Sequence, residues 1–211
     1  MRGTKSRMPV RYQMVALLTG GSMINYLDRV NIAVAAPVMM ESLGWDEAQF
    51  GVIFSAFLLG YALLQFPGGV LADRWNTHRL LILVCVGFSV FTALTPLGQL
   101  GFGLMLLLRF SVGMFESVTF PAYAALNARW IPRQEYSRAQ TLSVSGAYLG
   151  QAIAYPLTTW LLALFSWPVV FYCNALLGGI WLIAWMAFAT HKPEEHPRIS
   201  EHELAYIKDN L

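Results

Sequence analysis

The stretch that decides the fold is RLLILVCVGFSVFTALTPLG, residues 79–98, in which the only charged residue is Arg79. An α-helix rises about 1.5 Å per residue, so about 20 apolar residues can cross the hydrocarbon core of a bilayer, which is roughly 30 Å thick. Similar stretches occur at 12–35, 50–72, 101–125, 139–163 and 168–190. The sequence therefore predicts an all-α membrane protein with six transmembrane helices. Residues 1–11 precede this bundle as an N-terminal segment and residues 191–211 follow it as a polar segment.

The composition also indicates a lipid environment. Of the 211 residues, 56% are hydrophobic and 12% are charged, and the mean hydropathy is +0.51. Soluble domains carry about a quarter charged residues. The net charge of +2 is small, and no basic run alternates with aromatic residues, so we expect the bilayer and not a nucleic acid as a partner. The first apolar stretch lacks a small-residue cleavage site, which predicts a retained helix and not a signal peptide.

Basic residues lie on only one set of connectors, and positively charged loops stay on the cytoplasmic side of a membrane. The residues expected on this side are Arg2, Lys5, Arg7, Arg11, Arg74, Arg79, Arg129, Arg133, Arg138, Lys192, Arg198 and Lys208. The connectors at 41–47, 95–101 and 165–168 have no Lys or Arg. We therefore expect both termini in the cytoplasm. The short loops are typical of a multi-pass protein of a bacterial inner membrane.

The polar segment 191–211 is expected to begin the cytoplasmic linker that follows the six helices. Ser200 and Glu203 have the spacing of a capping box, which predicts a short amphipathic helix after Ser200.

No motif for an enzyme, a cofactor or a metal is present. The sequence has no paired-histidine metal motif, no nucleophile elbow and no glycine-rich phosphate loop. Three histidines near the C-terminal end have no cysteine at ligand spacing, so we expect them to be solvated; they are His191, His196 and His202. The two cysteines, Cys85 and Cys173, lie in apolar stretches and are expected to be buried free thiols.

Four charged residues remain inside the predicted helices: Asp28 and Arg29 in the first, and Arg109 and Glu116 in the fourth. Each would cost about 2.5 to 3.5 kcal/mol at a bilayer centre, so pairing or a water-filled cavity must offset the cost. Arg109 and Glu116 are seven residues apart, about two turns, and so share one helix face. Asp28 and Arg29 are adjacent and point about 100° apart. We expect both helices to line one cavity.

Two guanidinium groups facing a cavity have the forked donors that bind a carboxylate, which predicts an anionic substrate. Asp28 and Glu116 could titrate near neutral pH as their surroundings change, which would couple a proton to transport. Tyr26 and Tyr61 are candidate hydroxyl donors to the substrate, although packing is a common role for such residues. The alternative is that the four charges form ion pairs that lock two helices together.

Small residues at regular spacing predict close helix contacts in the second and fifth helices. They are Gly51, Ser55, Gly60, Ser143, Gly146 and Gly150.

The segment GGVLADRWNTHR, residues 68–79, resembles the signature loop between the second and third helices of the major facilitator superfamily. Gly69, Asp73 and Arg74 fit the pattern, whereas Asn76 stands where a second glycine is usual. The resemblance implies that these three residues form a gating loop. It also implies a transporter with two six-helix halves and a substrate site between them, of which this chain is the amino-terminal half.

Two further segments, NYLDRVNIAVAAP at 25–37 and RFSVGMFESVTFPA at 109–122, are similar to the anion:cation symporter family. This resemblance implies proton-linked carboxylates at Asp28 and Glu116. It implies that the substrate ligands are Tyr26, Arg29, Tyr61 and Arg109.

The predicted function is proton-coupled symport of a small organic anion, such as a sugar acid or another carboxylate, by alternating access with a second six-helix half. Ala147 stands where sugar-acid carriers often have a glutamine, and Gln151, one turn later, is the candidate to replace it. An efflux antiporter is an alternative, although Gly146, Gly150 and Pro156 match its helix-five signature only in part. A non-transporting membrane module that binds a ligand or partner is a second alternative, which the short length favours.

Overall fold

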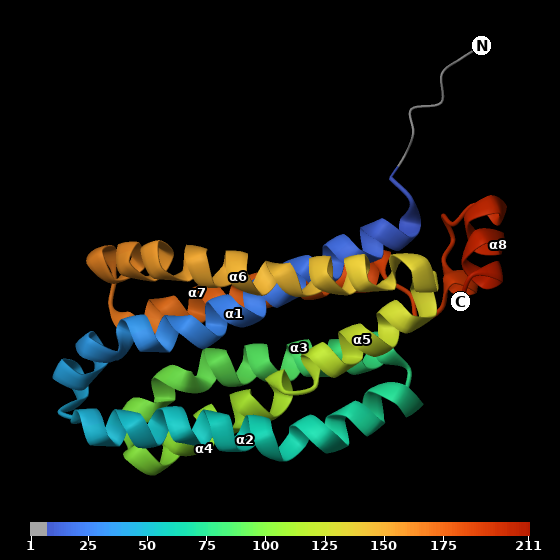
Figure 1. Ribbon diagram of the computed structural model, residues 1–211. Coiled ribbons are helices and arrows are strands. Elements are labelled where there is room, and N and C mark those ends of the chain that lie inside the picture. Colours follow the sequence, from blue (N-terminus) through green and yellow to red (C-terminus); the bar gives the residue numbers. More distant parts are fainter. Residues whose placement is uncertain (1–7) are drawn as a thin grey trace.

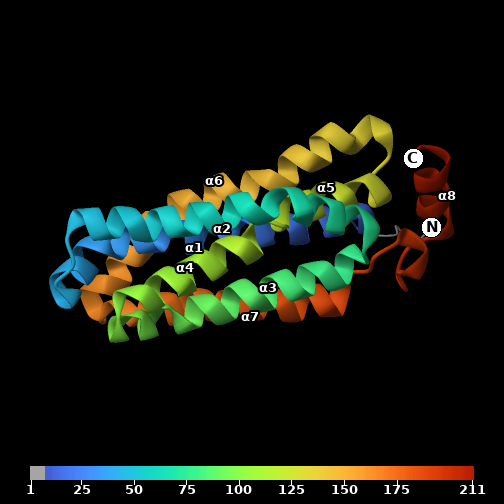
Figure 2. The ribbon, with the colours of Figure 1, turned by 90° about the horizontal axis from the view of Figure 1, so that it is seen from below.

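The computed structural model describes residues 8–211, and every regular element in that part is a helix. The α-helices are α1 (Val10–Leu43), α2 (Glu47–Arg74), α3 (Thr77–Leu94), α4 (Phe102–Glu116), α5 (Thr119–Trp130), α6 (Arg133–Leu164), α7 (Trp167–Phe188) and α8 (Glu201–Asp209). Two 3-10 helices are η1 (Thr95–Leu100) and η2 (Pro193–Glu195). The long helices run side by side as a bundle, and α8 lies beyond one end of it, near the start of α1 (Figures 1 and 2). Three basic residues of the orientation prediction, Arg2, Lys5 and Arg7, lie outside the described residues.

Four helical segments are long and apolar enough to cross a membrane: Glu47–Arg74, Thr77–Leu100, Phe102–Trp130 and Trp167–Phe188. The chain is therefore a multi-pass membrane protein. The helices α1 and α6 are longer, with 34 and 32 residues, but neither is among these four segments, because they are less apolar. In α1 the reason is visible in the sequence, because polar residues at 25, 28, 29 and 31 interrupt the apolar run.

Several predicted boundaries were wrong. The first helix does not end near residue 35 but continues through Pro37 to Leu43, where Gly44 ends it with a left-handed backbone, φ 68°. The fourth predicted helix is divided into α4 and α5, which are separated by Ser117 and Val118. The expected connector at 95–101 is mostly the 3-10 helix η1. A long apolar run locates a helix well, but it does not show where the helix ends.

Close contacts between helices depend on glycine at two interfaces. A Cβ on Gly146 or Gly150 of α6 would collide with backbone carbonyls of α1, and one on Gly60 of α2 would collide with the carbonyl of α4 residue Phe110. The predicted close-contact role of these three glycines is confirmed. The prediction was wrong for Gly51, where a Cβ would have no neighbour within 4 Å.

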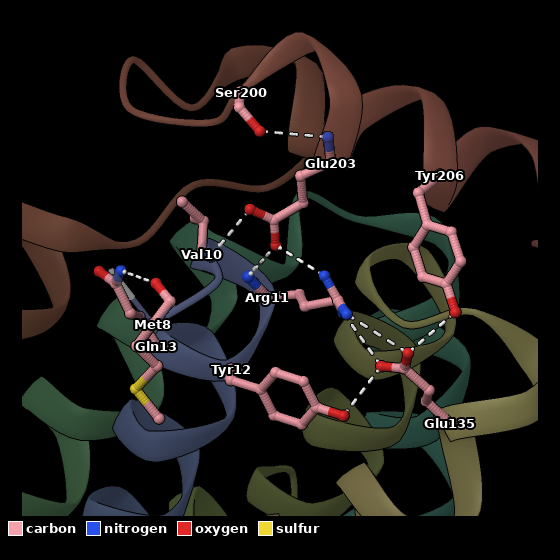
Figure 3. Close-up of polar contacts among 9 residues, drawn as sticks. All are labelled: Met8, Val10, Arg11, Tyr12, Gln13, Glu135, Ser200, Glu203 and Tyr206. Carbon is pink, nitrogen blue, oxygen red and sulfur yellow. Dashed lines mark hydrogen bonds and ion pairs between the residues drawn. The ribbon is translucent and has the colours of Figure 1, made fainter. Parts of the chain in front are cut away.

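The helix α8 is fastened to the end of the bundle through Glu203 (Figure 3). The Ser200 hydroxyl accepts a hydrogen bond from the Glu203 backbone N–H at 3.2 Å, which confirms the predicted cap of this helix. The Glu203 carboxylate, however, does not complete a capping box on α8. It accepts bonds from the backbone N–H groups of Val10 and Arg11, both at 3.0 Å. Because Pro9 at the start of α1 offers no side-chain cap, Glu203 satisfies amide groups that would otherwise be unpaired.

Five residues, Arg11, Tyr12, Glu135, Glu203 and Tyr206, form what we call the end cluster (Figure 3). The Arg11 guanidinium donates to Glu135 at 3.0 Å and to Glu203 at 3.2 Å. The hydroxyls of Tyr12 and Tyr206 each donate to Glu135 at 3.0 Å. The guanidinium also lies 5.1 Å from the ring centres of both tyrosines. The end cluster therefore joins α1, α6 and α8.

The expectation that the C-terminal histidines are solvated was wrong for two of them. His196 is buried and its ring Nε2 lies 3.1 Å from the carbonyl oxygen of Phe188. The Nδ1 of His191 accepts a hydrogen bond from the Thr77 backbone N–H at 3.1 Å. The segment after α7 packs back against the bundle and so covers these rings. His202, on α8, is exposed as expected.

Candidate functional site

The four charges predicted inside the helices lie on α1 and α4, and we call them the central cluster: Asp28, Arg29, Arg109 and Glu116. One ion pair links the two helices, because Arg29 Nη2 lies 3.0 Å from Glu116 Oε2 and Arg29 Nε donates to the same oxygen at 3.2 Å. Arg109 and Glu116 are both buried, as their shared helix face predicts.

Asp28 points to different partners from its neighbour Arg29. Its carboxylate accepts a hydrogen bond from the Thr92 hydroxyl of α3 at 2.8 Å and one from the Asn31 side chain at 3.3 Å. The predicted divergence of these adjacent side chains is therefore observed. As a result, α1 presents a carboxylate toward α3 and a guanidinium toward α2 and α4.

Aromatic rings surround the Arg29 guanidinium. Its central carbon lies 4.7 Å from the Tyr61 ring centre, 4.8 Å from that of Tyr26 and 5.2 Å from that of Phe57. Such contacts stabilise a cation where few water molecules can solvate it. The Arg109 guanidinium also lies over the Phe57 ring, at 5.3 Å. The two arginines thus share one aromatic neighbour.

The close approach of α2 to α4 places these rings. A Cβ on Gly113 of α4 would collide with the carbonyl oxygen of Phe57 and would lie 3.1 Å from the backbone nitrogen of Tyr61. With glycine there, the two backbones pack directly on each other. Tyr61 and Phe57 are consequently held beside the residues that α4 contributes.

Hydrogen bonding in the central cluster is incomplete. Glu116 Oε1 and one terminal nitrogen of Arg109 are buried without a protein partner, as are both polar atoms of the Asn25 side chain. Within residues 8–211, Arg109 has no carboxylate within ion-pair distance. Buried polar groups are normally satisfied, and each unsatisfied one calls for a bound molecule or a functional explanation. The two members of the ion pair also differ in exposure, because the Arg29 side chain is 25% exposed whereas that of Glu116 is fully buried.

The sequence identified all four charges and both tyrosines but missed two neighbours. Phe57 lies one helical turn before Tyr61, and that spacing could have identified it. Thr92 lies in an apolar helix where a threonine carries no special signal.

The alternative of charges that lock two helices together describes only the Arg29–Glu116 pair, because the remaining two charges do not pair with each other within 4.0 Å.

The predicted gating residues lie at the end of α2, away from the central cluster. Gly69 is half-buried inside α2, and Asp73 and Arg74 are exposed. The predicted loop is almost entirely helical, since α2 ends at Arg74 and α3 begins at Thr77. Arg129 of α5 holds this turn by donating to the Asp73 carbonyl at 2.9 Å, a contact that the sequence did not indicate.

Asn76, which stands in place of the usual glycine, has a local role here. Its side chain accepts a hydrogen bond from the Arg79 backbone N–H at 3.0 Å and caps the start of α3. Asparagine is among the residues that favour this position. The departure from the pattern is therefore compatible with a tight turn between α2 and α3.

Comparison with known proteins adds independent findings. The family model described as Major Facilitator Superfamily matches residues 18–208. The chain is 36% identical over 203 residues to an Arabidopsis thaliana protein described as sodium-dependent phosphate transport protein 1, chloroplastic, with 96% of the chain and 40% of that protein covered. It is 34% identical over 206 residues to a Bacillus subtilis protein described as a probable galactarate/D-glucarate transporter, with 94% and 45% covered.

A solved structure has a similar fold. It is the occupied, inward-facing form of a bacterial homologue of the human lysosomal transporter Spinster, with a TM-score of 0.80 at 22% identity, and the match covers 92% of this chain and 47% of that one. The chain thus spans less than half the length of the proteins it matches. Both relatives are described as transport proteins.

Proposed function

Because the chain belongs to the major facilitator superfamily, we propose that it forms the first half of a transporter that carries a small organic anion together with a proton. The observation that carries this proposal is the Arg29–Glu116 ion pair, in which the arginine is partly exposed among three aromatic rings and the glutamate is buried with one oxygen unpartnered. A cation in such a setting can exchange one carboxylate partner for another.

We propose that all six predicted segments cross the membrane, with α4 and α5 together forming the fourth. At about 1.5 Å per residue, the 34 residues of α1 and the 32 of α6 exceed the length that a span needs. The one-sided placement of Lys and Arg supports cytoplasmic termini and an inner-membrane location.

In the proposed substrate site, Arg29 binds the carboxylate of the anion in place of Glu116. A guanidinium can hold a carboxylate with two parallel hydrogen bonds. Tyr26 and Tyr61 are in contact with the same guanidinium, and we propose that their hydroxyls donate to the polar part of the anion. Arg109 supplies a second positive charge from α4. These four residues are the proposed substrate ligands.

The proposed coupling follows from the charges. The central cluster has two positive and two negative groups and is neutral. Protonation of Glu116 removes the charge that holds Arg29 and leaves the cluster with a net charge of +1, which favours entry of a monovalent anion. Loss of the proton restores the Glu116 carboxylate, which then competes with the anion for Arg29. Asp28 is the second proposed proton-linked carboxylate.

Alternating access requires a second six-helix half, against which this half would rock around the bound anion. The proposal assigns the turn of Gly69, Asp73 and Arg74 to gating. Its exposed position at the end of α2 supports contact with another part of the transporter. The partial match to an antiporter signature has a simpler explanation, because Gly146 and Gly150 allow α6 to contact α1.

The coupling ion has one specific alternative, because one relative is described as sodium-dependent. Uptake of radiolabelled organic acids and phosphate into proteoliposomes would test both ions. Three forms should be compared under an imposed proton or sodium gradient: the chain alone, the chain joined to a matching second half, and the joined form with Glu116→Gln. Proton-driven uptake that needs the second half and is lost in Glu116→Gln is the expected result. Sodium-driven uptake would show that the coupling ion is sodium and not a proton. Binding without uptake in every form would indicate a non-transporting module.

A further inference from the structure

A small cavity lies inside the bundle beside the central cluster, among α1, α3, α5 and α7. Its lining includes Gly21 and Asn25 of α1, Cys85 of α3, and Thr119 and Tyr123 of α5. It has about 10 Å³ of room for the centre of a water molecule, close to the minimum of roughly 10 to 15 Å³ that a cavity needs to hold one water.

Two polar side chains that line this cavity, those of Asn25 and Thr119, have no protein partners. Asn25 is fully buried, and both its amide nitrogen and its amide oxygen are unsatisfied. Thr119 is 4% exposed, and its hydroxyl is also buried and unsatisfied. The Tyr123 hydroxyl is close to the backbone of Gly21, since a Cβ added there would collide with it. One donor group, one acceptor group and two hydroxyls are thus gathered around one small space.

We propose that this cavity is a binding site for one ordered water molecule that bridges the Asn25 amide of α1 to the Thr119 hydroxyl of α5. A buried water makes two to four hydrogen bonds to groups that would otherwise be unpaired, whereas a cavity lined only by apolar groups remains dry. The alternative of leaving an amide and a hydroxyl unpaired in the interior is costly. Tyr123 is a third partner within the same lining.

The position of this water relates it to both carboxylates of the central cluster. Asn25 precedes Asp28 by three residues on α1, about 4.5 Å along the helix axis. Thr119, the first residue of α5, follows Glu116, the last residue of α4, by three residues. The start of α1 contacts Glu203 of α8, and Arg133 at the start of α6 donates to the carbonyl of Asn210, the residue after α8. Both displacements therefore run toward the same end of the bundle.

The water bridge accordingly fixes α1 against α5 at residues three positions from each carboxylate, on the side of α8. Asn25 and Thr119 are positioning residues that set the axial register of Asp28 against Glu116. This role in coupling rests on the proposed function, whereas the water site itself does not.

A double-mutant cycle on the 211-residue chain tests the bridge. Asn25→Leu and Thr119→Val each leave one partner of the water unpaired, so each should lower the apparent unfolding temperature by several degrees. The double variant removes both partners, so its apparent unfolding temperature should be no lower than that of the less stable single variant. Thr119→Ser, which keeps the hydroxyl, is the matched control and should retain the stability of the unchanged chain. Additive losses in the double variant would overturn the bridge.

Solid-state NMR in lipid bilayers provides a second readout that does not need the leucine variant to fold. Magnetisation should pass from water to the Asn25 side-chain amide in the unchanged chain and be lost in Thr119→Val. No transfer in the unchanged chain would mean a dry cavity and would overturn the site.

The positioning role is tested in the chain joined to a second half. The double variant should shift the pH at which uptake is half-maximal, and an unchanged pH profile would overturn that role. If the unchanged protein shows no proton-driven uptake, the proposed function fails, yet the stability cycle and the NMR signal still decide the water site.

Discussion

The central cluster and the end cluster contain the same kinds of groups but complete their hydrogen bonds to different extents. In the end cluster, both oxygens of Glu135 and both oxygens of Glu203 accept hydrogen bonds from protein donors. In the central cluster, Glu116 uses one oxygen, and Arg109 has an unpartnered nitrogen. The satisfied cluster lies at the bundle end, where water could also serve, and the unsatisfied one lies inside. The end cluster therefore fastens helices together, whereas the central cluster keeps unpaired polar groups, which the proposed function assigns to the binding of an anion.

The largest expected effect separates the two clusters by function. Glu116→Gln keeps the shape of the side chain but removes its titratable proton, so proton-driven uptake by the joined transporter should fall at least a hundredfold, about 2.7 kcal/mol in the barrier. The matched control Glu135→Gln should stay within about twofold, because Glu135 contributes only to the end cluster. The measurement is initial uptake in proteoliposomes under a proton gradient. Equal losses in both variants would remove the functional distinction.

The next effect separates them by stability. Arg11→Ala leaves Glu135 and Glu203 without their shared guanidinium, and we expect the 211-residue chain to lose about 1 to 2 kcal/mol of stability. Lys208→Ala removes one member of an ion pair whose side chains are 52% and 46% exposed, and should change stability by less than about 0.5 kcal/mol. Unfolding in detergent, followed by near-UV circular dichroism, measures both. A loss for Lys208→Ala as large as that for Arg11→Ala would contradict the ranking.

The docking of α8 should weaken in acid. Burial, the largest influence on Glu135, acts to raise its pKa, but hydrogen bonds from Arg11, Tyr12 and Tyr206 outweigh burial and hold the pKa below its ordinary value. Glu135 lies before the 139–163 stretch that is predicted to span the membrane. Because the folded state binds the proton less readily, the stabilisation is present above the ordinary glutamate pKa of about 4.3. It is lost as the pH falls through the lower pKa of the folded state.

Hydrogen exchange of the α8 amides as a function of pH measures this effect. Protection should decrease toward acid in the unchanged chain, and the decrease should be smaller in Glu135→Gln. Greater protection at low pH would show that the sign is wrong.

The smallest effect concerns the cap of α8. Ser200→Ala removes the hydroxyl that accepts from the Glu203 backbone and should cost about 0.5 to 1 kcal/mol. Ser200→Thr should retain most of the cap. Hydrogen exchange of α8 against that of α4 would show whether the loss stays local, since a change spreading to α4 would mean that the two clusters are not independent.

The sequence predicted the elements of this fold better than their endings. Long apolar runs identified the helices because burial in lipid requires about 20 such residues together. The interruption at Ser117 and Val118 and the extension of α1 to Leu43 depend on local packing and on Gly44, which average hydropathy does not detect.

The candidate site was predictable in its members but not in its pairing. Charges in apolar helices are conspicuous, so Asp28, Arg29, Arg109 and Glu116 were found. That Arg29 pairs with Glu116, 87 residues away, depends on how α1 and α4 pack. Thr92 has no unusual chemistry for a membrane helix, so only the packed structure brings it to the site, whereas Phe57 could have been identified from its spacing to Tyr61.

The most direct test of the central cluster's role is a count of protons taken up when an anion binds. The joined transporter in weakly buffered detergent should take up a proton with each monovalent organic anion near neutral pH, because binding replaces the Glu116 carboxylate at Arg29. The Glu116→Gln variant should bind the anion without taking up that proton. An equal proton count in the two proteins would contradict the exchange of partners at Arg29.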